Sequence, residues 1–152
     1  MSDWAIRQAK PSDYDSIIAV VNDWWGRDVR SSVPRLFLDH FHATSLIATS
    51  GEELAGFLVG FHSPCEPCEA YIHFVGVNPK FRGSGLASQL YQVFFSGARE
   101  RGRDIVRAIT SPINEDSIAF HLFMGFELTG PVPDYNGPGV ERIVFTRLLK
   151  GT

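Results

Sequence analysis

Cysteine is scarce in this chain of 152 residues, which contains only Cys65 and Cys68. Their C-x-x-C spacing is compatible with a redox pair or with half of a zinc site, but residues 63–67 are typical of a turn between strands. We therefore interpret them as two thiols in a loop of a reducing compartment, and we expect no metal.

The chain also lacks a strong excess of charge and any long apolar run. Its net charge is −3 and its pI is about 5.9, which argues against the basic surface of a nucleic-acid-binding protein. The apolar runs are too short to span a bilayer, and the N-terminus has no export signal, so we expect a cytoplasmic protein without a membrane partner. A hydrophobic content of 44% and a charged content of 20% predict one domain, residues 1–152, with a substantial core.

Residues 71–103 hold the most informative pattern. A β-rich run from Tyr71 to Val77 stops at Pro79, because proline cannot donate to a strand ladder. Two glycines, Gly83 and Gly85, then open a helix. Free N–H groups and the positive end of the helix dipole meet at such a start, so the pattern predicts a phosphate cradle. The run has neither the P-loop spacing nor the third glycine of the dinucleotide fingerprint.

The rest of the chain predicts an alternation of strands and helices. We expect strands at residues 4–9, 45–49, 54–62, 104–110, 126–128 and 142–149, the strand at 104–110 running parallel to the one before the glycines. Helices are expected from residue 11 to Gly26, over 33–42, from the glycines to Gly102, and from 117 to Gly125. The second helix should bury Leu36, Phe37 and Phe41, and the third should bury Leu86, Leu90, Val93, Phe94 and Ala98.

Two separated motifs carry a family resemblance. Residues 77–87 resemble motif A of the GCN5-related N-acetyltransferase (GNAT) superfamily, and residues 114–126, Asn-Glu-Asp-Ser-Ile-Ala-Phe-His-Leu-Phe-Met-Gly-Phe, resemble its motif B. The order of elements along nearly the whole chain also fits. The resemblance implies an α/β (α+β) fold with a mixed, mostly antiparallel, twisted sheet of about six to seven strands flanked by about four helices.

The same resemblance implies acetyl-CoA as acetyl donor, bound in a V-shaped gap between the strand that ends at Val77 and the strand at 104–110. Main-chain groups of the first strand would bind the pantetheine amides, and those of the glycine turn the pyrophosphate. The implied cofactor-binding residues are Val75, Gly76, Val77, Arg82, Gly83, Ser84, Gly85, Leu86, Ala87, Ser88, Asn114 and Phe120. From the residues alone, Ser84 and Ser88 could simply start the helix, Asn114 could cap the next one, and Arg82 could be a surface residue.

Acetyl transfer needs an oxyanion donor, a base and a proton for the thiolate. By family analogy the main-chain N–H of Val77 is the oxyanion donor. His121 stands where many relatives have a catalytic tyrosine, and two roles stay open for it: an acid, or a ring that packs beside the cofactor. Glu69, Tyr71 and His73 share one strand face by alternation. His73 is the first candidate for the base and Glu69 the second, although each could be structural.

These expectations describe an acetyl-CoA-dependent N-acetyltransferase that acetylates an amine of a small molecule or peptide by direct transfer. A non-catalytic acetyl-CoA sensor or interaction module is the alternative, and O-acetylation or transfer of a longer acyl group also stays open. Trp24, Trp25 and Phe37 lie in early helices that line the acceptor side in relatives, so an apolar or aromatic acceptor is as plausible as a cationic one. A homodimer is left open.

Overall fold

The computed structural model describes residues 3–149, in which the chain forms seven strands and four α-helices. The strand order is β1-β2-β3-β4-β5-β7-β6. The pairs β1–β2, β2–β3, β5–β7 and β6–β7 are antiparallel, and β4–β5 is parallel. This confirms the predicted mixed, mostly antiparallel sheet and its parallel strand pair.

Two compact units divide the chain. The described residues of Met1–Phe61 and Ile72–Gly97 form unit 1, and those of His62–Tyr71 and Ala98–Thr152 form unit 2. Strand β4 contributes to both units, because Glu69, Ala70 and Tyr71 belong to unit 2 and the following residues to unit 1. Each unit is described by itself below.

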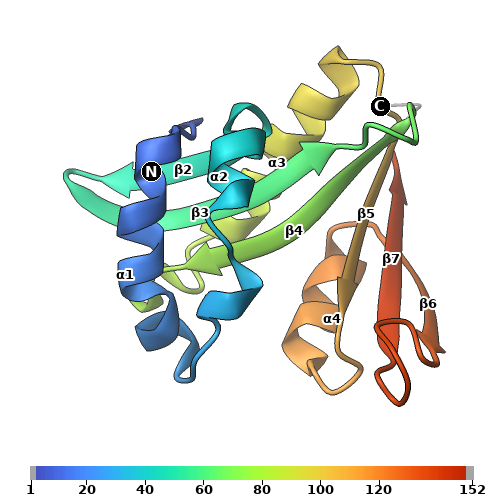
Figure 1. The fold of residues 1–152 in the computed structure, drawn as a ribbon. Helices are drawn as coiled ribbons and strands as arrows, with labels where there is room; N and C mark the ends of the chain where they lie inside the picture. The colour runs from blue at the N-terminus through green and yellow to red at the C-terminus, as the bar shows by residue number, and fades with distance from the viewer. Residues whose placement is uncertain (1–2, 150–152) are drawn as a thin grey trace. The chain divides into compact units, whose positions relative to one another are not determined.

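Unit 1 packs helices on both faces of its strands. Its elements are β1 (Ala5–Gln8), α1 (Tyr14–Trp25), α2 (Leu36–Phe41), β2 (Leu46–Ser50), β3 (Glu53–His62), β4 (Glu69–Val77) and most of α3 (Leu86–Glu100). Helices α1 and α2 lie in front of β2 and β3 in Figure 1. On that face a core forms around Ile17, Val21, Leu38 and Phe57. On the other face the side chain of Leu86 packs against Gly56. A Cβ added at Gly56 would lie 3.0 Å from Leu86 Cδ2.

Two predicted helix faces need correction. In α2, which starts at residue 36 rather than 33, Leu36 is 49% exposed and Leu38 is fully buried, while Phe37 and Phe41 are half-buried. In α3, Val93 is exposed, whereas Tyr91 and Phe95 are buried beside the correctly predicted residues. Helical periodicity predicts an apolar stripe along a helix, but the elements that pack against the helix determine which residues of the stripe are buried.

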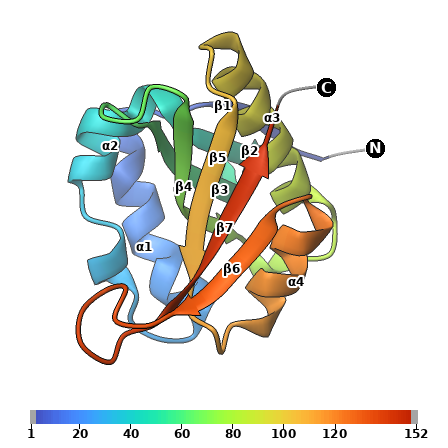
Figure 2. The same cartoon turned by 90° about the vertical axis from the view of Figure 1, so that its right-hand side faces the viewer.

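Unit 2 contains β5 (Ile105–Thr110), α4 (Glu115–Phe123), β6 (Glu127–Val132) and β7 (Arg142–Leu148), with the first residues of β4 and the end of α3. Strand β6 is longer than the strand predicted at residues 126–128 and extends to Val132. Figure 2 shows α4 on one side of β5 and β7, and the β6–β7 loop extending on the other side. No helix within residues 3–149 is long and apolar enough to cross a membrane.

Candidate acetyl-CoA site

The glycine turn between β4 and α3 has the backbone that the sequence predicts. Gly83 has φ +77° and Gly85 has φ +92°, in the left-handed region that side chains rarely adopt. A Cβ added at either position would meet no atom within 4 Å. Glycine is therefore required at these two positions by the positive φ and not by crowding. The open space also lets a ligand approach the main chain closely.

Several main-chain N–H groups of this turn have no partner. Within residues 3–149, no hydrogen bond engages the N–H groups of Gly83, Gly85, Leu86 or Ala87. The first N–H groups of a helix lack intrahelical acceptors, and the helix dipole places partial positive charge at the same end. Helix α3 is 15 residues long, so many peptide dipoles add up along it, and the N–H groups at its start are suited to bind an anion.

The last residues of β4 present a second set of main-chain groups. The N–H of Asn78 donates to Ala55 O of β3 at 2.8 Å. Because successive N–H and C=O groups of a strand point to opposite edges, those of Val75 and Val77 point away from β3. The register of the parallel pair with β5 covers Glu69, Ala70 and Tyr71, so Val75 and Val77 lie beyond it. A row of main-chain donors and acceptors thus leads to the glycine turn.

The side chains of the turn are mostly occupied by the protein itself. Arg82 Nη2 donates to Trp24 O at 2.6 Å, at the end of α1. The Ser84 hydroxyl donates to Phe81 O, and the Leu86 side chain is buried in the core. Ser88 lies half-buried in the first turn of α3. The main chain, more than these side chains, is available to a ligand.

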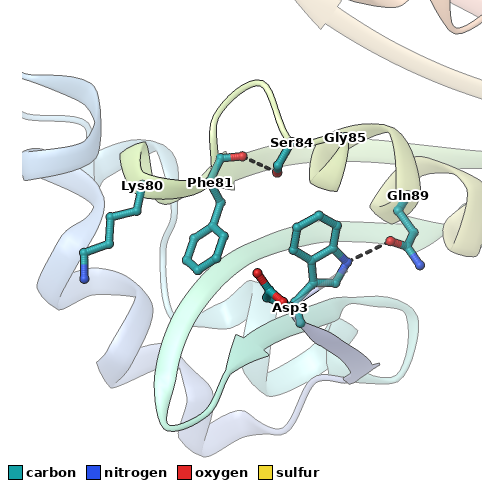
Figure 3. Close-up of a pocket in the computed structure, with 7 residues that line it drawn as sticks. Asp3, Lys80, Phe81, Ser84, Gly85 and Gln89 are labelled. Carbon is teal, nitrogen blue, oxygen red and sulfur yellow. Dashed lines mark hydrogen bonds between the residues drawn. The ribbon is translucent and has the colours of Figure 1, made fainter. Parts of the chain in front are cut away.

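A cavity of about 470 Å³ lies beside the glycine turn, on the side of the N-terminal strand. Figure 3 shows its lining, in which the indole N–H of Trp4 donates to Gln89 Oε1 at 2.7 Å. Asp3 contributes a carboxylate, and Lys80 is paired with Glu53 at 3.0 Å. This lining offers an anion little positive charge, so the open N–H groups are better placed for a pyrophosphate than the cavity is.

His73 is held in one tautomer by unit 1. Its Nε2 lies 2.7 Å from Ser32 O, and its ring stacks on Phe37 with centroids 4.1 Å apart. A carbonyl oxygen can only accept, so Nε2 carries the proton and Nδ1 carries the lone pair. Burial lowers the pKa of His73, and the bond to Ser32 partly offsets this shift. His73 is therefore neutral near pH 7 and can accept a proton at Nδ1.

The aromatic residues that precede the site pack closely on β4. Trp25 stacks on Phe74 with centroids 4.7 Å apart, and an added Cβ at Gly76 would lie 2.5 Å from the Phe57 ring. Phe74 and its neighbour His73 both contact rings of the α1–α2 segment, so the strict side-chain alternation assumed from the sequence does not hold between them.

Glu69 and Tyr71 lie in unit 2, where Glu69 is not a free carboxylate. Its Oε1 accepts a hydrogen bond from Arg107 Nε at 2.9 Å, and Arg107 Nη1 donates to Thr146 Oγ1 at 2.9 Å. Burial, aided by the nearby Tyr135, raises the pKa of Tyr71 to about 12. The sequence interpretation did not single out Arg107. A charged residue between the buried Val106 and Ala108 of one strand was the signal that could have identified it.

His121 is buried in unit 2. Its ring stacks on Phe145 with centroids 4.1 Å apart and an interplanar angle of 5°, and 6% of the residue is exposed. Nδ1 lies 2.8 Å from Ser117 O, which makes Nδ1 the protonated nitrogen. Burial lowers the pKa of His121, against a smaller opposing effect of the Ser117 bond. The ring is thus neutral at pH 7, and its proton is engaged by a carbonyl.

The remaining motif B residues are structural in part. Asn114 Oδ1 accepts from Ser117 N at 3.2 Å, so Asn114 caps α4 as one of its two interpretations expected. Phe120 is half-buried on α4 beside His121.

Cys65 and Cys68 are exposed free thiols in the β3–β4 connection. Residues 3–149 contain no group of three or more histidine, cysteine or acidic side chains placed to hold a metal.

Comparison with known proteins identifies a family that fits this geometry. The model of the acetyltransferase (GNAT) family matches residues 9–126. An L-2,4-diaminobutyric acid acetyltransferase of Vibrio parahaemolyticus is 32% identical over 117 residues, covering 76% of this chain and 63% of that protein. The chain thus spans less than two thirds of the length of this relative.

Two further comparisons extend over more of the chain. An L-methionine sulfoximine/L-methionine sulfone acetyltransferase of Pseudomonas paraeruginosa is 28% identical over 143 residues, covering 85% of this chain and 83% of that protein. The structure of a diaminobutyrate acetyltransferase from Paenibacillus lautus, in complex with L-2,4-diaminobutyric acid and coenzyme A, superposes with a TM-score of 0.75. It is 18% identical, and the match covers 98% of this chain and 96% of that one, so it establishes the shared fold.

Proposed function

Because the chain belongs to the acetyltransferase (GNAT) family, we propose that it transfers the acetyl group of acetyl-CoA to an amine of a small molecule. One observation carries the proposal most: outward main-chain groups of Val75 and Val77 lead directly to the unpartnered N–H groups of the glycine turn. The pyrophosphate would bind the N–H groups of Gly83, Gly85, Leu86 and Ala87, and the pantetheine amides would pair with the strand edge.

The proposed reaction is a direct transfer. The neutral amine attacks the thioester carbonyl, forming the N–C bond, and the developing oxyanion accepts a hydrogen bond from the N–H of Val77. Collapse breaks the C–S bond and releases CoA as its thiolate. His73 accepts the amine proton at Nδ1, and its tautomer supports this role because the Ser32 carbonyl holds the other nitrogen protonated.

The thiolate is proposed to leave without a proton from His121. The stack on Phe145 and the hydrogen bond from Nδ1 to Ser117 O support the packing role, because donation from Nδ1 would break that bond. The lowered pKa of His121 also disfavours an imidazolium. The ring of His121 also contacts the edge of Phe126, so it packs among aromatic side chains on more than one side.

The acceptor is proposed to be an amine that also carries an amino-acid head group. Relatives from Vibrio and Pseudomonas are named for amino-acid substrates, diaminobutyrate and methionine sulfoximine or sulfone. The half-buried rings of Trp25, Phe37 and Phe74 would provide apolar surface in unit 1 for the carbon chain of the acceptor.

Release of the free CoA thiol tests this function. The purified protein is mixed with acetyl-CoA and a panel of diamino acids, simple diamines, aromatic amines and short peptides, and the thiol is measured over time. Thiol release that depends on the acceptor, together with a product heavier by one acetyl group, is the expected result. Acetyl-CoA binding without acceptor-dependent release, across the whole panel, would instead establish the sensor that the sequence left open.

A further inference from the structure

The β3–β4 connection carries both cysteines of the chain. It runs from Ser63 to Cys68, between the last residue of β3 and the first residue of β4, and the chain has no cysteine besides Cys65 and Cys68. Both are free and exposed. Accessible thiols exchange with small-molecule disulfides, whereas buried thiols are inert. What the two thiols can do together depends on how the connection holds them.

Hydrogen bonds close this connection into a loop. Ser63 N donates to Glu69 O at 3.0 Å, and Glu69 N donates to Glu66 O at 3.0 Å. Inside the loop, Cys65 N and Glu66 N both donate to Ser63 Oγ, at 3.2 and 3.0 Å. The chain therefore folds back on itself between Ser63 and Glu69. A disulfide needs Cα atoms no more than about 7 Å apart, and a tight turn brings residues three apart, such as Cys65 and Cys68, into that range.

A single guanidinium holds the loop together. Arg103 Nη1 donates to the main-chain oxygens of Ser63 at 2.9 Å, Glu66 at 3.1 Å and Glu69 at 3.2 Å. These three oxygens alternate with the two cysteines along the chain, so each cysteine lies between two residues that bind the same nitrogen. Their main-chain positions are thus fixed relative to each other.

The groups that hold the loop are themselves anchored. Arg103 N donates to Ala98 O at the end of α3 at 2.9 Å, and Asp104 N and Ile105 N donate to Cys68 O at 2.9 and 3.1 Å. All of these residues belong to unit 2. Because the fold has already ordered the loop, joining its two cysteines costs little further conformational entropy.

We propose that Cys65 and Cys68 form a dithiol site that a small-molecule disulfide, glutathione disulfide being the probe, converts into a disulfide within the loop. The thiolate of one cysteine attacks the S–S bond, forms a mixed disulfide and releases one glutathione thiolate. The thiolate of the other cysteine attacks the protein sulfur of that mixed disulfide, which closes the Cys65–Cys68 bond and releases the second glutathione. The protein dithiol is oxidised, and glutathione disulfide is reduced to two thiols. The site is independent of acetyl transfer.

The number of glutathione molecules released distinguishes this reaction from simple glutathionylation. Reduced protein is equilibrated with reduced and oxidised glutathione, quenched with acid, alkylated and analysed as intact protein by mass spectrometry. Closing the loop disulfide releases two glutathione molecules. Diluting total glutathione tenfold at a constant ratio of its two forms should therefore raise the ratio of oxidised to reduced protein about tenfold. A mixed disulfide releases only one, so its ratio would not respond to dilution.

The single-cysteine variants are matched controls for the wild type. Cys65→Ser and Cys68→Ser should each take up one glutathione, and dilution should leave that uptake unchanged. The wild type should retain no glutathione, and its two free thiols should disappear together.

Two further variants test the scaffold of the loop. Ser63→Ala removes the acceptor of Cys65 N and Glu66 N, and Arg103→Met removes the donor to three main-chain oxygens. Each should lower the ratio of oxidised to reduced protein by about 5-fold in the same glutathione mixture, because the effective concentration of the second thiol falls. Arg101→Met is the control, since the Arg101 side chain makes no hydrogen bond within residues 3–149, and it should leave the ratio unchanged.

Glutathione retained by the wild type at both cysteines, or a ratio that does not respond to dilution, would overturn the proposal. Wild-type thiols that both stay free in a large excess of glutathione disulfide would do the same. A wild-type equilibrium in Ser63→Ala and Arg103→Met, each folded by circular dichroism, would show that the loop does not hold the pair and would also overturn it. If Arg103→Met does not fold, Ser63→Ala decides this point alone.

Discussion

Replacing His121 with phenylalanine separates packing from proton transfer. Phenylalanine keeps a planar ring against Phe145, where the present centroids are 4.1 Å apart, but it cannot titrate. The hydrogen bond to Ser117 O is lost, which costs about 1 kcal/mol, and the extra apolar burial offsets part of this. We expect a folded variant whose stability at pH 8 lies close to that of the wild type.

The pH dependence of stability should change in a defined direction. Burial lowers the pKa of His121 in the folded state, so the unfolded chain binds more protons at pH values between the folded pKa and about 6.5. The free energy of unfolding of the wild type therefore falls as the pH drops through this window. One proton contributes a slope of up to about 1.4 kcal/mol per pH unit, and His121→Phe removes it.

Urea unfolding from pH 8 to pH 5, followed by tryptophan fluorescence, measures the difference between the two proteins. His62 and His73, whose pKa values burial also lowers, are present in both and cancel. The variant should gain stability relative to the wild type as the pH falls below about 6.5. If the free energies of unfolding of the two proteins changed with pH in the same way, the interpretation of His121 as a buried neutral group would be wrong. A loss of kcat of roughly 100-fold or more, with unchanged acetyl-CoA affinity, would refute the packing role and restore the acid.

Four further substitutions test the site and its support. His73→Ala should remove the acidic limb of the pH–rate profile, a limb that the lowered pKa places below about pH 6.5, and an unchanged profile would exclude His73 as base. Gly85→Ala should raise the KM for acetyl-CoA and cost about 1–2 kcal/mol of stability, because φ at Gly85 is +92°. Gly97→Ala inside α3 is the control and should stabilise the protein by about 0.5–1 kcal/mol. Thermal unfolding and kinetics of both variants measure these effects. Gly76→Ala should destabilise by about 1–3 kcal/mol in urea unfolding, because its Cβ would lie 2.5 Å from the Phe57 ring; a neutral effect would mean that the ring moves aside at little cost.

Local signals predicted the ends of α1 and α3 and the conformation of the glycine turn. Gly26 and Gly102 follow helix ends with φ +74°, and Gly83 and Gly85 have the positive φ that a tight turn before a helix requires. These features depend on backbone conformation, which a few neighbouring residues determine. The parallel pair followed from the strand–helix–strand order, whereas the fold class followed from the family resemblance.

Features that depend on distant partners were harder to predict. Leu36 was expected in the core and lies outside it, because helical period does not specify which face meets another element. The Glu69–Arg107–Thr146 contacts join three strands, and no spacing in the sequence brings these residues together. The tautomers of His73 and His121 depend on carbonyls of Ser32 and Ser117, and only the structure assigns them.

A crystal structure with bound CoA tests the proposed site most directly. We predict pyrophosphate oxygens within about 3 Å of the main-chain nitrogens of the glycine turn, including Gly83 and Gly85. The pantetheine amides should pair with the main chain of Val75 and Val77. A pyrophosphate bound elsewhere, such as in the cavity beside Trp4, with the N–H groups of the turn facing only solvent, would contradict the account.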